Sequence, residues 1–215
     1  MINVLCVKWG TKYSSEDVNR LRAMVSKYLY QPFTFYCHTD DPAGVDAEII
    51  PIEEDLEIYW NKLSMFQPGF VPTGDVNLYF DLDIVIQIDI TPLLKFLQDD
   101  LTMVRAYWKG DLVTDGSSSK FKERWDMYAN SSVLLWKNHT LHNIWEHFES
   151  NMDYWMIKYK GIDRFLFHEG FKLNWFPEGL IYSHRYEDYD PSKMIYLING
   201  LEYPQPLVAK YLDLG

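Results

Sequence analysis

Two aspartates, Asp81 and Asp83, follow an apolar segment that reads V-N-L-Y-F over residues 76–80. An extended backbone places side chains at i and i+2 on one face, so the two carboxylates are expected to lie close together. Two carboxylates held this close repel each other and are costly to bury. A divalent cation between them removes that cost, and hard ions such as Mn²⁺ or Mg²⁺ prefer oxygen ligands. One carboxylate acting as a nucleophile is the other chemical interpretation, and a solvated acidic turn is the non-functional one.

Length and composition favour one folded unit with a large core. The chain has 215 residues, of which 47% are hydrophobic and 17% aromatic, and its formal net charge is −11. Nucleic acids and anionic membrane surfaces both require a basic surface, so this charge argues against them as partners. A small anionic ligand is compatible with the sequence if cations gather locally. The candidate cations beside expected strand ends are Lys8, Lys12, Lys62, Arg105 and Lys109.

Cysteine content and hydropathy bear on the compartment. Cys6 and Cys37 fall in expected buried strands, and two cysteines in a chain of this length do not form a disulfide framework. The apolar segment at residues 2–7 is too short for a signal peptide and has no basic start. No segment approaches the roughly 18 apolar residues of a transmembrane helix. These features predict a cytoplasmic protein with no integral membrane segment.

Hydrophobic spacing predicts strands and helices that alternate in the first half of the chain. Residues 14–17, Ser-Ser-Glu-Asp, provide an N-cap and an acidic first turn, and apolar residues at helical spacing follow them as far as Leu29. The expected strands cover residues 2–9, 33–39, 47–52, 76–81, 84–88, 102–108, 131–136 and 194–198. The expected helices cover residues 14–29, 59–66, 91–97 and 139–148.

This alternation is typical of an α/β fold with a mainly parallel central sheet, helices on both faces and an irregular C-terminal half. In such sheets, ligands bind beyond the carboxyl ends of the strands. Asp81 and Asp83 come at such an end, as do the segments 9–11 and 39–40. The sequence therefore predicts a binding site at this edge of the sheet.

Five segments, in this order, resemble the GT-A glycosyltransferases, particularly small bacterial and viral members related to glycosyltransferase family 8. The first two are Lys8-Trp9-Gly10-Thr11-Lys12-Tyr13, which resembles the nucleotide-binding first loop, and Cys37-His38-Thr39-Asp40-Asp41-Pro42, which resembles the T-D-D turn. The next are residues 60–66, which resemble the W-x-K-L-x-x-F helix, and residues 79–83, which resemble the metal-binding DxD motif. The last is Asn130-Ser131-Ser132-Val133, which resembles the N-S-G-V segment that lines the donor sugar.

The resemblance implies a Rossmann-like GT-A domain over residues 1–215, with a nucleotide-binding half at 1–90 and an acceptor and donor-sugar half at 91–215. It implies an enzyme that uses Mn²⁺ or Mg²⁺ to move a hexose from a UDP-sugar to a saccharide or other hydroxylated acceptor, with retention of configuration. Implied metal ligands are Asp81, Asp83 and Asn199, and implied catalytic residues are Lys62, Asn130 and Asp163. Implied donor-binding residues are Trp9, Gly10, Thr11, Tyr13, Thr39, Asp40, Lys62, Asp81, Leu82 and Ser131.

The chain departs from the family pattern at two places. Gly161-Ile162-Asp163-Arg164 stands where the family often has Gly-Asp-Gln, so Asp163 is displaced by one residue. Asn199-Gly200 stands where the family has His-Gly, and an asparagine carbonyl is a weaker ligand than imidazole for Mn²⁺. The second departure puts one of the metal ligands in doubt.

Two other functions remain open. Asp81-Leu82-Asp83-Ile84-Val85 also fits the D-x-D-x-[TV] motif of haloacid-dehalogenase-like phosphatases, although that fold places the motif near its first strand and requires a later acidic pair. A catalytically silent sugar-nucleotide binder is the second alternative, and Asn199 in place of histidine is its support.

Overall fold

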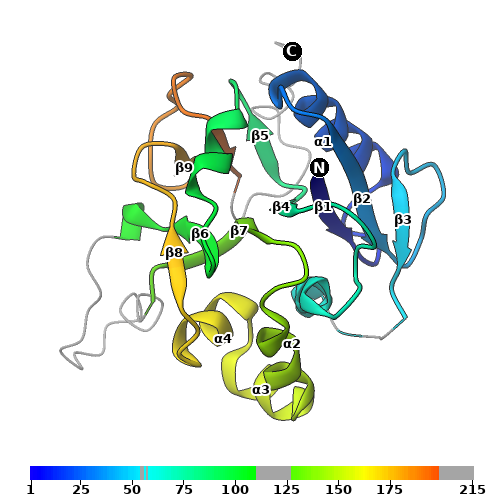
Figure 1. Ribbon diagram of the computed structural model, residues 1–215. Coiled ribbons are helices and arrows are strands. Elements are labelled where there is room, and N and C mark those ends of the chain that lie inside the picture. Colours follow the sequence, from blue (N-terminus) through cyan, green and yellow to red (C-terminus); the bar gives the residue numbers. More distant parts are fainter. Residues whose placement is uncertain (54–55, 57, 110–126, 199–215) are drawn as a thin grey trace.

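The computed structural model describes residues 1–53, 56, 58–109 and 127–198. Within these residues, a seven-stranded sheet in the order β3-β2-β1-β4-β7-β6-β8 forms the centre of the molecule (Figure 1). Its strands are β1 (Ile2–Lys8), β2 (Phe33–Thr39), β3 (Glu48–Pro51), β4 (Val76–Phe80), β6 (Leu101–Arg105), β7 (Ala129–Lys137) and β8 (Leu173–Trp175).

The strand directions confirm a mainly parallel α/β sheet. β1 pairs in parallel with both β2 and β4, and β2 pairs in parallel with β3. β7 runs antiparallel between β4 and β6, and β8 is parallel to β6. Because β7 is reversed, its first residues lie at the same edge as the carboxyl ends of β1, β2 and β4. This brings residues near 130 to residues near 81, far apart in sequence.

Helix α1 (Ser15–Tyr28) covers one face of the sheet, and its start follows from a capping box. The Ser14 side chain accepts a hydrogen bond from the backbone of Asp17, and the Asp17 carboxylate accepts one from the backbone of Ser14. The apolar side chains Val18, Leu21 and Val25 are fully buried against the sheet. The expected helix at residues 14–29 is therefore confirmed to within a residue at each end.

The other face of the sheet is covered by the 3₁₀ helix η1 (Ile58–Phe66) and by three α-helices, which lie together at the bottom of Figure 1. These are α2 (His142–Glu149), α3 (Met152–Tyr159) and α4 (Ile162–His168). Trp60 of η1 stacks on Phe148 of α2 with ring centroids 5.3 Å apart, and Phe165 of α4 contacts both rings. Burial of these aromatic rings fixes η1 and α4 relative to each other.

A second sheet of three strands packs on the α1 face. It consists of β5 (Ile84–Ile86), β9 (Ile181–Ser183) and β10 (Ile195–Leu197), in the order β5-β10-β9 within the described residues. We expected residues 84–88 to continue the strand before the aspartates, and this was wrong. The chain leaves the central sheet at Asp81, and β5 pairs antiparallel with β10 instead.

Other expected elements differ in their bounds. The strand expected at residues 102–108 ends at Arg105, and the 3₁₀ helix η3 (Tyr107–Lys109) follows, in which Trp108 stacks on Tyr186. The helix expected from residue 139 begins at His142, because His139 and Leu141 have positive φ angles. The helix expected at 91–97 is the 3₁₀ helix η2 (Thr91–Phe96), and α3, α4, β8 and β9 were not predicted. In the part of the chain that the structure describes, no helix is long and apolar enough to cross a membrane.

Candidate functional site

The Asp81–Asp83 turn is held in place by backbone hydrogen bonds from two elements. The Asp81 amide donates to the Ser132 carbonyl at the start of β7 (2.9 Å), and the Ile198 amide donates to the Asp83 carbonyl (3.0 Å). A guanidinium nitrogen of Arg20 lies 3.4 Å from the Leu82 carbonyl. The turn therefore joins the central sheet, the small sheet and α1, and its backbone is fixed at three successive residues.

Lys62 forms an ion pair with Asp81. Its Nζ lies 2.5 Å from Asp81 Oδ1 and 3.4 Å from the Ser131 hydroxyl. The same Asp81 oxygen accepts a hydrogen bond from the Tyr79 hydroxyl at 2.5 Å. The side chains of Lys62 and Asp81 are 11% and 19% exposed, so water screens this pair only weakly.

Asp83 is an electrostatically strained carboxylate. Burial raises its pKa, and the negative charge of Asp81 raises it further, while Lys12, Lys62 and a hydrogen bond from Tyr13 oppose the shift in part. Burial and the two carboxylates also raise the pKa of the Tyr13 hydroxyl, which keeps it protonated as a donor to Asp83. The repulsion expected from the spacing of the aspartates is thus present, and an added cation would relieve it.

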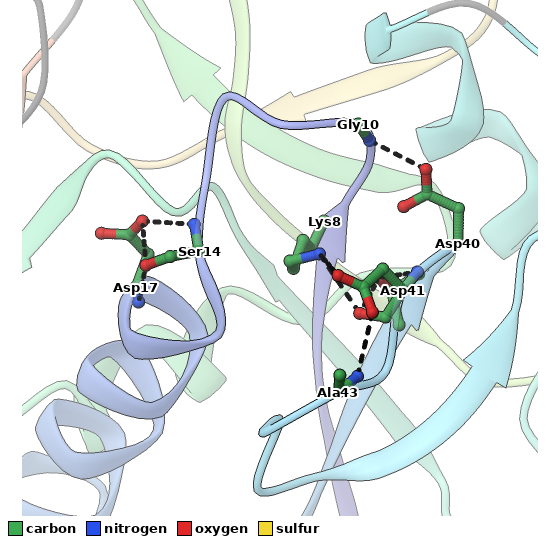
Figure 2. A network of polar contacts seen from close by, with 8 residues as sticks. Lys8, Gly10, Ser14, Asp17, Asp40, Asp41 and Ala43 are labelled. Carbon is green, nitrogen blue, oxygen red and sulfur yellow. Dashed lines mark hydrogen bonds and ion pairs between the residues drawn. The ribbon is translucent and has the colours of Figure 1, made fainter.

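The loop between β1 and α1 is fixed at both ends, as Figure 2 shows. The Gly10 amide, at φ +62°, donates to Asp40 Oδ2 (3.0 Å), and the Ser14 amide donates to Asp17 Oδ2 (2.7 Å). Lys8 reaches the Asp41 carbonyl at 3.2 Å. The loop thereby keeps Trp9, Thr11 and Tyr13 along one wall of a cavity.

An irregularity in β7 leaves three residues near its start without a partner on β6. Met103 of β6 pairs with Leu134, whereas the next residue, Val104, pairs with Asn130, so residues 131–133 have no β6 partner. The freed segment places Asn130, Ser131 and Ser132 along a second cavity. The Asp163 Oδ1 at the start of α4 accepts a hydrogen bond from the Ser131 amide (2.9 Å) and lines the same cavity.

The two cavities meet at the Lys62–Asp81 pair. The cavity lined by Trp9, Thr11 and Tyr13, here the Trp9 cavity, has a volume of about 470 Å³. The cavity lined by Asn130, Ser131 and Asp163, here the Ser131 cavity, has a volume of about 380 Å³. Lys62, Asp81, Asp83 and Tyr59 line both, so charged groups separate a partly aromatic compartment from a polar one.

Some expected site residues lie elsewhere. Gly10, Thr39 and Asp40 are not among the residues that line the two cavities; Thr39 is buried and Asp40 holds the Gly10 amide. Asn199 and the family's His-Gly position lie outside the described residues. Of the expected cations, Lys12 lines the Trp9 cavity. Lys8 pairs with Asp41, and Arg105 lies over the rings of Tyr107 and Tyr128. The side chain of Lys109 lies outside the described part of the chain.

Comparison with solved structures establishes the fold. The galactosyltransferase LgtC, solved with donor and acceptor sugar analogues, matches 99% of this chain and 95% of its own, with a TM-score of 0.63 and 13% identity. An active-site mutant of LgtC matches 99% of this chain and 94% of its own, with the same TM-score and 12% identity. The chain has the GT-A fold. No protein-family model matches it, and no curated protein matches it in sequence.

Several residues that line the site of this GT-A fold were not anticipated. Tyr79 precedes the aspartates on β4 and bonds one of them, and its V-N-L-Y-F context indicated only a buried strand. Tyr59 lies between the two cavities and donates to the Lys160 carbonyl (2.6 Å). Lys160, Gly161 and Ile162 line the Ser131 cavity because α3 ends at Tyr159 and the next residue, Lys160, has a φ of +51°. Predicting α3 and α4 would have been needed to find them.

The donor groups fit a hard divalent ion with few protein ligands. Among the described residues, no three His, Cys, Asp or Glu side chains gather as a metal site, so the chain offers the Asp81–Asp83 pair. Mg²⁺ is usually held by one or two carboxylates together with water and substrate phosphates. Burial, and then the charge of Asp81, raise the pKa of Asp83, and a bound cation would offset both effects. Asp81 and Asp83 therefore suit Mg²⁺ or Mn²⁺ shared with a phosphorylated ligand.

Proposed function

We propose that the protein is a metal-dependent glycosyltransferase that moves a hexose from a UDP-sugar to a saccharide or other hydroxylated acceptor. The observation that carries the proposal is the meeting of Lys62, Asp81 and Asp83 with Asn130, Ser131 and Asp163 around one cavity at the carboxyl edge of a GT-A sheet. A diphosphate bound between the two cavities would face the acidic pair and Lys62 together. Its two ends would then extend into compartments of different chemistry.

The Trp9 cavity suits the nucleoside and the Ser131 cavity suits the sugar. Trp9 and Tyr13 give the first cavity aromatic faces for a planar base, and Thr11 adds a hydroxyl. Asn130 and Ser131 offer neutral donors and acceptors that match sugar hydroxyls. The Gly10–Asp40 bond contributes indirectly, since it fixes the loop that carries Trp9 and Thr11.

Transfer requires the diphosphate to leave with negative charge, and a bound Mn²⁺ or Mg²⁺ would neutralise that charge. Asp81 and Asp83 would hold the ion, and the flexible ammonium of Lys62 would contact the phosphates. Asp163 is fixed by the Ser131 amide, so its carboxylate is oriented toward the sugar compartment before a ligand arrives. There it would stabilise positive charge that develops at the anomeric carbon. Retention of configuration is proposed from the family resemblance.

A thermal-shift panel tests the proposal. UDP and UDP-hexoses with Mn²⁺ should raise the melting temperature, and the shift should disappear with a chelator, because a ligand that binds only the folded state stabilises it. UMP with Mn²⁺ should give a much smaller shift. A chelator-insensitive UDP shift would contradict metal dependence, and hydrolysis of p-nitrophenyl phosphate without any nucleotide effect would favour the phosphatase alternative.

Asp40→Ala should weaken UDP binding about fivefold by releasing the Gly10 amide and the loop behind it, consistent with the net contribution of about 1 kcal/mol from one exposed hydrogen bond. The melting temperature of the free protein should stay the same, because Asp40 is exposed. Asp46→Ala, which removes another exposed carboxylate that pairs with Arg22, is the matched control. Unchanged UDP affinity in Asp40→Ala would exclude this role for the loop contact.

The remaining assignments follow from the same proposal. Residues 1–90 would form the nucleotide-binding half and residues 91–215 the sugar and acceptor half of one domain, and β1, β2 and β4 with β6 and β7 share one sheet across that division. A cytoplasmic location is proposed as well. It is supported by Cys6 and Cys37, two buried free thiols that face each other in register on β1 and β2.

A further inference from the structure

Lys62 already pairs with one oxygen of Asp81, a carboxylate that a divalent ion would need as a ligand. Its ammonium is 2.5 Å from Asp81 Oδ1, and the Tyr79 hydroxyl donates to the same oxygen, so that oxygen already has two donors. The Tyr79 ring lies below the ammonium, 5.3 Å from ring centroid to Nζ, and the Ser131 hydroxyl lies 3.4 Å away. The ammonium is therefore bound by three neighbouring side chains and is not a solvated surface charge.

A divalent ion and this ammonium exclude each other when no anion is present. Both would be within contact distance of one carboxylate in a poorly hydrated site, where like charges repel strongly. Asp81 and Asp83 together carry two negative charges at most, and the ammonium already neutralises one of them. Metal binding to the free protein must therefore displace the Lys62 ammonium from Asp81.

A diphosphate changes this balance because it brings further negative charge. Lys62 lines both the Trp9 cavity and the Ser131 cavity, and its long side chain on η1 can move from Asp81 toward a ligand in either one. We propose that Lys62 is an internal counterion of Asp81. Its ammonium leaves Asp81 to a metal ion only when a bound diphosphate provides the ammonium with another anionic partner. Lys62 thereby couples metal binding to nucleotide binding. This inference rests on the proposed function.

The consequence for the free protein is a suppressed metal affinity. Coupling between two ligands is reciprocal, so a side chain that opposes the metal in the absence of diphosphate must increase the factor by which diphosphate improves metal binding. Removing the charge of Lys62 should raise the metal affinity of the nucleotide-free protein. It should also reduce the factor by which diphosphate improves metal binding. A lysine whose only role is to contact phosphate would leave the metal affinity of the free protein unchanged.

The test is Mn²⁺ binding to the nucleotide-free protein, measured by the electron paramagnetic resonance signal of free Mn²⁺. Lys62→Met keeps the length and the apolar stem of the side chain, and it should bind Mn²⁺ at least about tenfold more tightly than the wild type. Lys62→Arg keeps the charge and should stay within about threefold of the wild type. Lys160→Met removes a cation from the same Ser131 cavity and is the matched control, with an expected change below about threefold.

Three results would overturn the inference. The first is equal Mn²⁺ affinity of wild type and Lys62→Met, and the second is no measurable Mn²⁺ binding to either protein. The third is tighter Mn²⁺ binding that persists in the double variant Lys62→Met/Asp83→Asn, because the ion would then bind elsewhere. Repeating the titration with saturating UDP separates this inference from the proposed function. If UDP tightens Mn²⁺ binding equally in wild type and Lys62→Met, the coupling role fails and the function stands. If UDP binds neither protein, the proposed function fails.

Discussion

Asp83→Asn should abolish the metal-dependent stabilisation by UDP and lower donor turnover by about 100-fold or more. The variant keeps the size of the side chain but removes one of the two carboxylates that would hold the ion beside the departing diphosphate. Loss of a single group that stabilises developing charge typically costs 100-fold to 1,000-fold. At ligand concentrations about 100 times Kd, the wild type should gain about 2.7 kcal/mol in unfolding free energy, and the variant should gain almost none.

The stability of the free protein distinguishes loss of function from misfolding in this variant. Because burial and Asp81 raise the pKa of Asp83 above its usual value, the ionised carboxylate destabilises the native state at neutral pH, and this cost declines as the pH falls through the folded-state pKa. Asp83→Asn should therefore be at least as stable as the wild type without ligand. Asp99→Asn changes an exposed carboxylate paired with Lys137 and is the control. A variant that retains a chelator-sensitive UDP shift would refute the metal assignment.

Glu169→Gln should destabilise the helical wall of the Ser131 cavity by about 2 kcal/mol, the usual range for hydrogen bonds to a charged group. Glu169 follows α4 and accepts hydrogen bonds from His147 of α2 (2.8 Å), from Lys158 of α3 (2.9 Å) and from the Tyr159 hydroxyl. It therefore ties α2 to α3 and α4, and the junction of α3 and α4 carries residues 160–164 into the cavity. Chemical denaturation at pH 7 measures the loss, with the exposed Glu178→Gln as control.

The same contacts predict how this stabilisation depends on pH. Partial burial opposes ionisation of Glu169, but the hydrogen bonds from Lys158, Tyr159 and His147 outweigh it and lower the pKa from 4.5 to about 2. A lowered folded-state pKa gives stability that is complete above the unfolded value and is lost as the pH falls toward the folded one. The difference in unfolding free energy between wild type and Glu169→Gln should thus shrink between about pH 5 and pH 2. A difference that stays constant over this range would show that the charge of Glu169 is not responsible.

The first half of the fold could be predicted because local signals and tertiary packing agree there. Local sequence predicts α1 from the capping box at Ser14 and from an apolar face at helical spacing, and it predicts β4 from the buried run before Asp81. The parallel strands β1, β2 and β4 agree with these predictions. The second half could not be predicted in the same way. The short helices α3 and α4 bury aromatic residues against α2, so tertiary contacts define them more than an apolar stripe does.

The sequence likewise predicted some features of the site but not others. The paired carboxylates, Lys62 and residues 130–131 were expected near one another, and the structure places them around one cavity. The ion pair between Lys62 and Asp81 was not expected, since nothing in the spacing of residues 62 and 81 indicates a contact across elements. The same holds for residues 131–133 of β7, which have no partner on β6 and contain no distinguishing residue type. A local sequence pattern does not predict contacts that depend on how neighbouring strands are aligned.

The most direct test of the proposed function is to follow UDP-hexoses with the purified protein by proton NMR, with Mn²⁺ or with a chelator. Even without an acceptor, slow transfer to water should release UDP and free hexose from at least one UDP-hexose when Mn²⁺ is present. The release should stop with the chelator and in Asp83→Asn, and should fall sharply in Asp163→Asn. Intact donors under all conditions, with UDP bound only weakly and independently of Mn²⁺, would contradict a metal-dependent glycosyltransferase.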